Sequence, residues 1–180
     1  MISKLATVYP LAKIVGESKI EVGNRSQIDD FVFINTGIEC RLGKFVHIAS
    51  FCSIIGGGRF TMEDFSGLSA GCRIITGSDD FTGGFLTNPT VPTQFTNVHV
   101  SEVIIEKHAI IGTNVVIFPG VKVGEGAAVG AGGIVRKNLE PWTIYAGVNP
   151  RMVGKRDRDG ILARERELLR EFEICSDINE

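Results

Sequence analysis

Aliphatic residues recur along the chain with two nested spacings. In the first part they form groups of three, six residues apart within a group, and the whole pattern repeats every 20 residues: Ile2, Val8, Ile14; Val22, Ile28, Ile34; Leu42, Ile48, Ile54; and Met62, Leu68, Ile74. A spacer recurs at Ile20, Cys40 and Phe60, and the six-residue step returns from Ile105 to Val135. Helices space apolar residues three and four apart, and hairpins alternate without a fixed count of six. The pattern predicts an all-β solenoid of stacked three-sided coils.

The repeat is interrupted between residues 77 and 102. This segment has no six-residue spacing, and Gly83-Gly84 breaks any regular strand. A long irregular segment within a compact domain is usually functional or disordered. We expect a loop that extends from the solenoid at this point.

Apolar residues between Ile161 and Phe172 follow helical spacing after the last repeat. They predict an amphipathic helix that begins near Asp159 and covers the last coil, whose open edge would otherwise invite strand addition. We therefore expect a solenoid domain over residues 1–156 and a helix and tail over residues 157–180.

Composition and charge exclude several classes of protein. The 180 residues have a formal net charge of −2 and no long basic run, so nucleic acid is not an expected partner. No signal peptide and no stretch of about 18 apolar residues are evident, which predicts a cytoplasmic protein without membrane insertion. Cys40, Cys52, Cys72 and Cys175 lack zinc-finger spacing. We expect reduced thiols, with Cys52 and Cys72 adjacent in successive coils and within disulfide range.

Glycine directly follows several aliphatic positions, and the stretch IIGTNVVIFPGVKVGEGAAVGAGGIV resembles the hexapeptide-repeat acyltransferases. The resemblance covers roughly residues 10–156. It implies a left-handed parallel β-helix of about six coils, assembled as a homotrimer. It also implies acetyl-CoA as co-substrate, with the loop embracing an active site between subunits.

His47 is the first candidate for the base that acyl transfer requires. It precedes the inward Ile48, so alternation along a strand turns it outward, towards a neighbouring subunit. The surrounding INTGIECRLGKFVHIAS resembles amino-sugar N-acetyltransferases, and this resemblance assigns Asn35 to acceptor binding. Where those enzymes read IEHD, this chain has Ile38-Glu39-Cys40, so their usual base is missing and His47 matches the second histidine.

The start of the loop supplies further candidates. Sugar O-acetyltransferases carry their base in a TGHP-like motif, and this chain reads TGSDD at that place. We expect Ser78 and Asp79 to bind the acceptor and Asp80 to take part in catalysis, because paired carboxylates can orient a base or act as one. His99 and His108 are less favoured by their positions.

The second block of repeats resembles the CoA groove of the same family. Carried over by position, the candidate cofactor-binding residues are Thr113, Ala131, Arg136, Lys137 and Arg151. A small residue at Ala131 permits close approach of the pantetheine arm, and the cations would meet the phosphates.

Three classes of function remain open: an acetyltransferase, a metal-dependent hydratase and a scaffold without catalysis. The loop sequences SDDFTGG and LTNP resemble acyltransferases of surface polysaccharide and O-antigen, which predicts acetyl transfer to a sugar hydroxyl in lipopolysaccharide biosynthesis. The alternatives are N-acetylation of a nucleotide-linked amino sugar and a trimeric scaffold without catalysis. The γ-type carbonic anhydrases share the β-helix, but the spacing of the three histidines does not match their zinc site. No metal is therefore expected.

Overall fold

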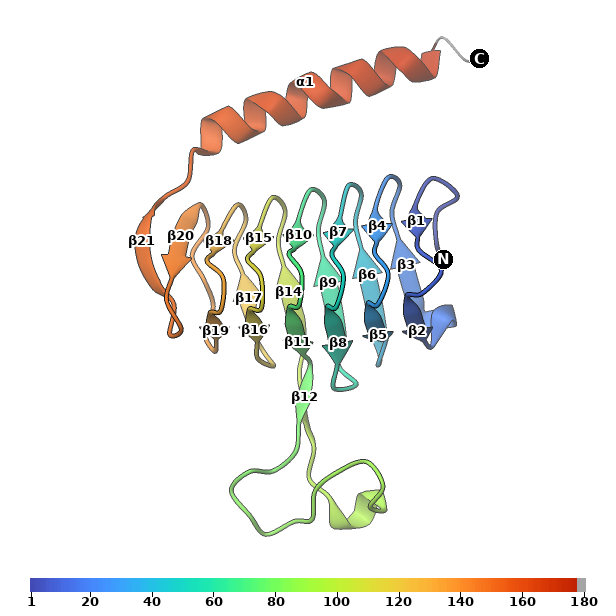
Figure 1. Ribbon diagram of the computed structural model, residues 1–180, viewed down its shortest axis with the longest axis vertical. Helices are drawn as coiled ribbons and strands as arrows, with labels where there is room; N and C mark the ends of the chain where they lie inside the picture. Colours follow the sequence, from blue (N-terminus) through green and yellow to red (C-terminus); the bar gives the residue numbers. More distant parts are fainter. Residues whose placement is uncertain (178–180) are drawn as a thin grey trace.

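The computed structural model describes residues 1–177, with side chains placed as far as residue 172. The chain folds as predicted into a left-handed parallel β-helix with a single helix at its C-terminus (Figure 1). Short strands build three flat faces around one continuous core, and a loop projects from one corner of this prism.

Each face is a parallel sheet whose neighbouring strands come from successive coils. The first face contains β1 (Thr7–Val8), β4 (Gln27–Ile28), β7 (His47–Ile48), β10 (Gly67–Leu68), β15 (Ile110–Ile111), β18 (Ala128–Val129), β20 (Thr143–Ala146) and the antiparallel β21 (Arg151–Lys155). The second face contains β2 (Lys13–Val15), β5 (Phe33–Asn35), β8 (Ser53–Ile55), β11 (Arg73–Ile75), β16 (Val116–Ile117) and β19 (Ile134–Val135). The third face contains β3 (Ile20–Val22), β6 (Glu39–Leu42), β9 (Arg59–Met62), β14 (Val103–Ile105) and β17 (Lys122–Val123).

The predicted aliphatic residues of the complete coils form the core. Ile28 pairs in register with Ile48, and Ile48 with Leu68, so side chains of successive coils stack directly. The spacer residues also stack, because Cys40 pairs with Phe60. Phe60 is 1% exposed. Burying one such ladder on each face gives the fold its stability, since every coil covers the apolar surface of the next.

The structure has about seven coils, one more than the sequence predicts. The additional coil contains β20, whose Tyr145 pairs with Val129. Six residues after Val135 the chain has Pro141, so the aliphatic repeat cannot be followed into this coil. Leu139 and Thr143 are buried there instead.

The loop leaves and rejoins the prism through one short antiparallel pair. β12 (Gly77–Ser78) pairs with β13 (His99–Val100), with Ser78 opposite His99. The residues between these strands project away from the prism and include the 3-10 helix η2 (Thr93–Phe95) (Figure 1). A second 3-10 helix, η1 (Glu17–Lys19), lies before β3. The predicted loop is therefore confirmed, and it connects the second face to the third.

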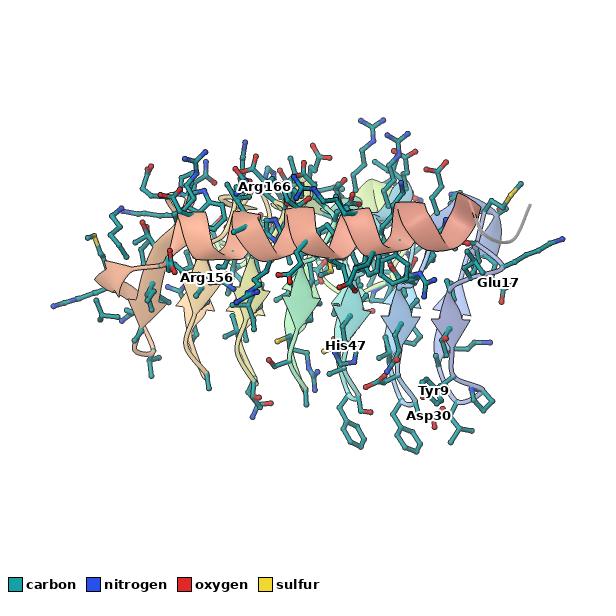
Figure 2. All side chains as sticks on the ribbon, turned by 90° about the horizontal axis from the view of Figure 1, so that it is seen from above. Tyr9, Glu17, Asp30, His47, Arg156 and Arg166 are labelled. Carbon is teal, nitrogen blue, oxygen red and sulfur yellow. The ribbon has the colours of Figure 1, made fainter. Side chains whose placement is uncertain are left out.

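Helix α1 (Arg158–Asp177) does not cap the last coil, contrary to the prediction. It runs back along the prism over the corner between the third and first faces (Figures 1 and 2). Its far end reaches the early coils, where Phe172 lies 5.7 Å from Phe45 between ring centroids and under the guanidinium of Arg25. The edge of the last coil is covered by β21 instead. Within the described residues, no helix is long and apolar enough to cross a bilayer.

An aromatic stack along this corner explains where the helix packs. One corner residue per coil adopts left-handed backbone angles, with φ between 54° and 61° at Arg25, Phe45, Phe65, His108 and Trp142. The rings of Phe45 and Phe65 stack at 4.8 Å, and His108 stacks on Phe65 at 5.2 Å. The stack presents a continuous apolar strip, which the apolar face of α1 partly covers.

Cys40, Cys52 and Cys72 are buried free thiols. Cys52 and Cys72 precede Ser53 and Arg73, which pair between β8 and β11, so the two cysteines occupy equivalent places in successive coils as predicted. The side chain of Cys175 lies outside the described residues.

Candidate active site

A cavity of about 420 Å³ lies where the two ends of the loop meet the later coils. Its wall includes both ends of the loop and two residues that follow strands of the second face: Ser78, Asp79, Asp80, His99, Phe118 and Arg136. We call this cavity the loop pocket. It brings together all three predicted loop residues, one predicted cofactor-binding residue and a histidine that the sequence ranked low.

The two carboxylates of the loop pocket have only local partners. An oxygen of Asp79 accepts a hydrogen bond from the backbone N–H of Asn88 at 3.4 Å, and Asp80 accepts from the amide and hydroxyl of Thr82 at 2.8 and 2.6 Å. The hydroxyl and amide of Thr82 hold the pKa of Asp80 below its usual value. Within the described part of the chain, neither carboxylate forms an ion pair. Both are available to a cationic group of a ligand.

A second cavity of about 330 Å³ lies beside β19. Arg136, Lys137 and Arg151 line it, and the segment before Arg151 is held in place because the N–H of Ile134 donates to the carbonyl of Val148 at 2.7 Å. We call this cavity the cation pocket. It unites three of the five predicted cofactor-binding residues, and three cations around one cavity suit the phosphates of a nucleotide.

Thr113 and Ala131 lie away from the cation pocket, on the corner between the first and second faces. They occupy equivalent places in successive coils, and the N–H of Gly132 donates to the carbonyl of Thr113 at 2.8 Å. Both side chains are exposed. The second face separates this corner from Arg136, so a ligand that touches both must lie across that face.

Comparison with known proteins decides the family. No family model matches the chain. The dTDP-4-amino-4,6-dideoxy-D-glucose acyltransferase of Escherichia coli is 34% identical over 148 residues, which cover 82% of this chain and 77% of that protein. The chain is a hexapeptide-repeat acyltransferase.

Solved structures of a related acyltransferase agree with this assignment. The N-acyltransferase AntD of Bacillus cereus, in complex with dTDP and 3-hydroxybutyryl-CoA, superposes with a TM-score of 0.88 at 37% identity, over 94% of this chain and 89% of AntD. Another AntD complex contains dTDP-4-amino-4,6-dideoxyglucose and coenzyme A. The predicted acyl-CoA co-substrate agrees with these complexes. WbbJ of Escherichia coli K12, named for O-acetyl transfer in lipopolysaccharide biosynthesis, is 30% identical over 129 residues, 69% of this chain and 60% of WbbJ.

The structure places His47 away from the loop pocket of this acyltransferase. His47 lies on β7 in the first face, exposed, with its Nε2 3.1 Å from Asp29 (Figure 2). Burial opposes ionisation of Asp29, but hydrogen bonds from Gln27 and His47 outweigh it and lower the pKa of this carboxyl. Asn35 ends β5 in the second face, where it accepts from the N–H of Gly37. Neither residue lines the loop pocket of its own chain.

His99 is the histidine that the structure adds to the site. Its position opposite Ser78 in the β12–β13 pair brings it to the wall of the loop pocket. The sequence could have indicated this role of His99, because a loop that leaves and rejoins one corner must bring its two ends together. Among the described residues, no cluster of three or more histidine, cysteine or acidic side chains could hold a metal.

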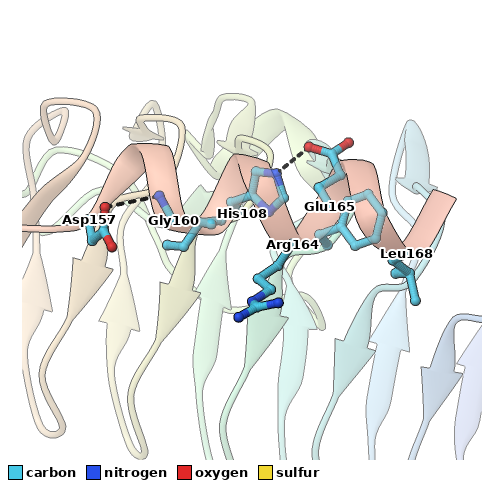
Figure 3. A pocket seen from close by; sticks show the side chains of 8 residues that line it. His108, Asp157, Gly160, Arg164, Glu165 and Leu168 are labelled. Carbon is cyan, nitrogen blue, oxygen red and sulfur yellow. Dashed lines mark hydrogen bonds and ion pairs between the residues drawn. The ribbon is translucent and has the colours of Figure 1, made fainter. Parts of the chain in front are cut away.

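A cavity of about 670 Å³ lies between α1 and the aromatic corner (Figure 3). His108, 6% exposed, places its Nε2 2.8 Å from an oxygen of Glu165, and Lys107 pairs with the other oxygen. This ion-pair cluster fixes the middle of α1 to the prism. Its only candidate from the sequence is His108, which is engaged with Glu165 and lies on the aromatic corner rather than in the loop pocket.

Acid should release α1. Burial opposes ionisation of Glu165, but Lys107 and His108 outweigh it and lower the pKa of this carboxyl. Its stabilisation is therefore complete above the usual glutamate pKa of about 4.3 and is lost as the pH falls through the lower folded value. Trp142, the single tryptophan, lies beside His108 and Arg158, so its fluorescence should change below about pH 4. Glu165→Gln should remove this transition, and the exposed Glu167→Gln should retain it; identical profiles in all three proteins would refute the assignment.

Proposed function

We propose that this acyltransferase transfers an acetyl or other short acyl group from acyl-CoA to the amino group of a nucleotide-linked amino sugar. The observation that carries the proposal is the loop pocket, where Asp79 and Asp80 form no ion pair within the described residues. A pair of carboxylates attracts an ammonium group strongly and a neutral hydroxyl weakly. The names of the Escherichia coli relative and of AntD, an amino-sugar acyltransferase and an N-acyltransferase, support the same choice.

The chemistry requires a proton acceptor in this pocket. The acceptor ammonium must lose a proton before its nitrogen attacks the thioester carbonyl, and Asp79 or His99 is placed to receive it. The nitrogen attacks the thioester carbonyl and forms the new C–N bond of a tetrahedral intermediate. Collapse of this intermediate breaks the C–S bond, and the departing thiolate of CoA takes up the second proton that the nitrogen loses. Asp80 has a lowered pKa, so it stays ionised and suits binding of the ammonium better than proton transfer.

A second part of the acceptor site is proposed on the first face. Some solved AntD complexes contain a variant in which one serine is replaced, and others contain a variant in which one aspartate is replaced. In the AntD chain this aspartate follows the serine by ten residues. Ser69 and Asp79 are the one serine–aspartate pair with this order and spacing here. Ser69 follows β10, next to the coil of His47. A site that uses Ser69, His47 and Asp79 together would join the first face of one copy to the loop of another, which favours the homotrimer.

The test compares two acceptors that share the dTDP nucleotide and differ at carbons 4 and 6 of the sugar. Thiol release from acetyl-CoA should be rapid with dTDP-4-amino-4,6-dideoxyglucose and absent with dTDP-glucose, which carries hydroxyls on the same nucleotide. Turnover of dTDP-glucose alone would favour the O-acetyl transfer suggested by the similarity to WbbJ. If neither acceptor is turned over and acetyl-CoA does not raise the thermal midpoint, the result would favour a trimeric scaffold without catalysis. Because acyl-CoA and nucleotide sugars are cytoplasmic metabolites, we expect the protein to work in the cytoplasm.

A further inference from the structure

Arg136 belongs to both cavities of the site. It lines the loop pocket together with Asp79 and Asp80, and it lines the cation pocket together with Lys137 and Arg151. Lys137, its neighbour in the chain, lines only the cation pocket. Arg136 is therefore a residue that the two cavities share.

Phe118 holds Arg136 in this position. The N–H of Phe118 donates to the carbonyl of Val135 at 3.0 Å, so Phe118 lies directly beside Arg136 in the preceding coil. The guanidinium carbon of Arg136 lies 5.1 Å from the centroid of the Phe118 ring, within the range of a cation–π contact. Phe118 packs against the core, which makes it a firm support. Within the described residues, Arg136 forms no ion pair, so its N–H donors are available to ligands.

We propose that Arg136 binds both substrates at once, and this inference rests on the proposed function. A guanidinium presents five N–H donors in a planar fork, so one edge can meet oxygens in the cation pocket while the other meets oxygens in the loop pocket. An amino-sugar nucleotide carries a positive amine and a negative diphosphate. The carboxylates of Asp79 and Asp80 suit its amine, and Arg136 on the facing wall suits its anionic part. The same side chain then also contacts the phosphates of acyl-CoA, so both substrates are held at one residue.

A shared residue has a kinetic signature that separate binding residues lack. Arg136→Gln removes the charge and the fork, so the KM of acetyl-CoA and the KM of the amino-sugar nucleotide should both rise by about tenfold or more, the effect of losing one charged hydrogen bond to each. Arg136→Lys keeps the charge but not the planar fork and should show the same double effect, smaller in size. The matched control Lys137→Gln should raise only the KM of acetyl-CoA.

Phe118 acts through Arg136 and is tested as a positioning residue. Phe118→Leu should raise both KM values in the pattern of Arg136→Gln. Phe118→Tyr should keep both KM values near those of the wild type, because tyrosine retains the aromatic face. A purely structural role would instead lower the thermal midpoint and leave both KM values at their wild-type values.

The decisive experiment measures both KM values in the wild type, Arg136→Gln and Lys137→Gln, and also the thermal midpoint shifts produced by CoA alone and by dTDP alone. The proposal expects Arg136→Gln to weaken both shifts and Lys137→Gln to weaken only the CoA shift. It is overturned if Arg136→Gln affects one ligand only or neither. If the wild type binds both ligands but acylates no amino sugar, the proposed function fails while the two midpoint shifts still decide whether Arg136 is shared.

Discussion

Replacing both loop carboxylates by amides, Asp79→Asn with Asp80→Asn, is expected to lower kcat/KM for the amino-sugar acceptor by about 100-fold or more. The change keeps the size of both side chains but removes the two charges that would attract the ammonium group and a group placed to accept its proton. Thiol release from acetyl-CoA at varied acceptor concentration measures the loss. The thermal midpoint shift with acetyl-CoA should not change, because the cation pocket retains Lys137 and Arg151.

The single variants separate the two roles. Asp80 stays ionised because Thr82 donates to it twice, so Asp80→Asn should act mainly on the KM of the acceptor. Asp79→Asn should lower kcat. Glu102→Gln, an exposed acid at the other end of the loop that does not line the pocket, is the matched control. Full turnover in the double variant would show that the loop pocket does not hold the reacting amine.

Phe60→Ala is expected to destabilise the fold by about 3–5 kcal/mol, the usual cost of truncating a fully buried aromatic residue. Phe60 is 1% exposed and fills the spacer position between Cys40 and Val103 in the adjacent coils. The smaller side chain would leave a cavity in the middle of the ladder, where both neighbouring coils lose contacts. Chemical denaturation followed by circular dichroism measures the change.

Thr61→Ala is the control for this variant. Thr61 follows Phe60 on β9 but points away from the core and is only partly buried, so its truncation should change stability by less than about 0.5 kcal/mol. Equal midpoints for Phe60→Ala and the wild type would mean that the spacer ladder does not contribute to stability as the packing indicates.

The fold could be predicted because its core is periodic. Each inward residue, such as Ile48 or Ile111, has the same environment as its equivalents in the neighbouring coils, so the sequence must repeat a similar side chain at a fixed interval. The prediction ended one coil early where this condition fails. Pro141 occupies the position where the six-residue step predicts an aliphatic residue. Tyr145, which this step does not reach, pairs with Val129 instead.

The place of the helix could not be predicted from its own amphipathic pattern. That pattern shows that one side of α1 meets an apolar surface, but not which surface. The missing signal lay in the corners: Phe45 and Phe65 are separated by one full coil of 20 residues, and they stack. A repeat of aromatic residues at turn positions marks an apolar strip outside the core, and such a strip needs a cover.

The candidate site could be predicted only in part. Strand alternation correctly turns His47 outward, but it cannot show that the two ends of the loop lie beside Phe118 and Arg136. The grouping of Asp79 and His99 follows from the closure of the loop, a tertiary event without local periodicity. The cation pocket was easier to predict, because Arg136 and Arg151 flank a coil whose geometry the repeat already determines.

The β12–β13 pair makes the loop an insertion that can be replaced as a unit. Gly77 lies opposite Val100, so the chain leaves and re-enters the prism at neighbouring positions. Residues 79–98 can therefore change in length and sequence without altering the register of any coil. A chain built in this way can acquire a new acceptor by exchanging one contiguous segment, while the coils that would bind the acyl donor are inherited unchanged.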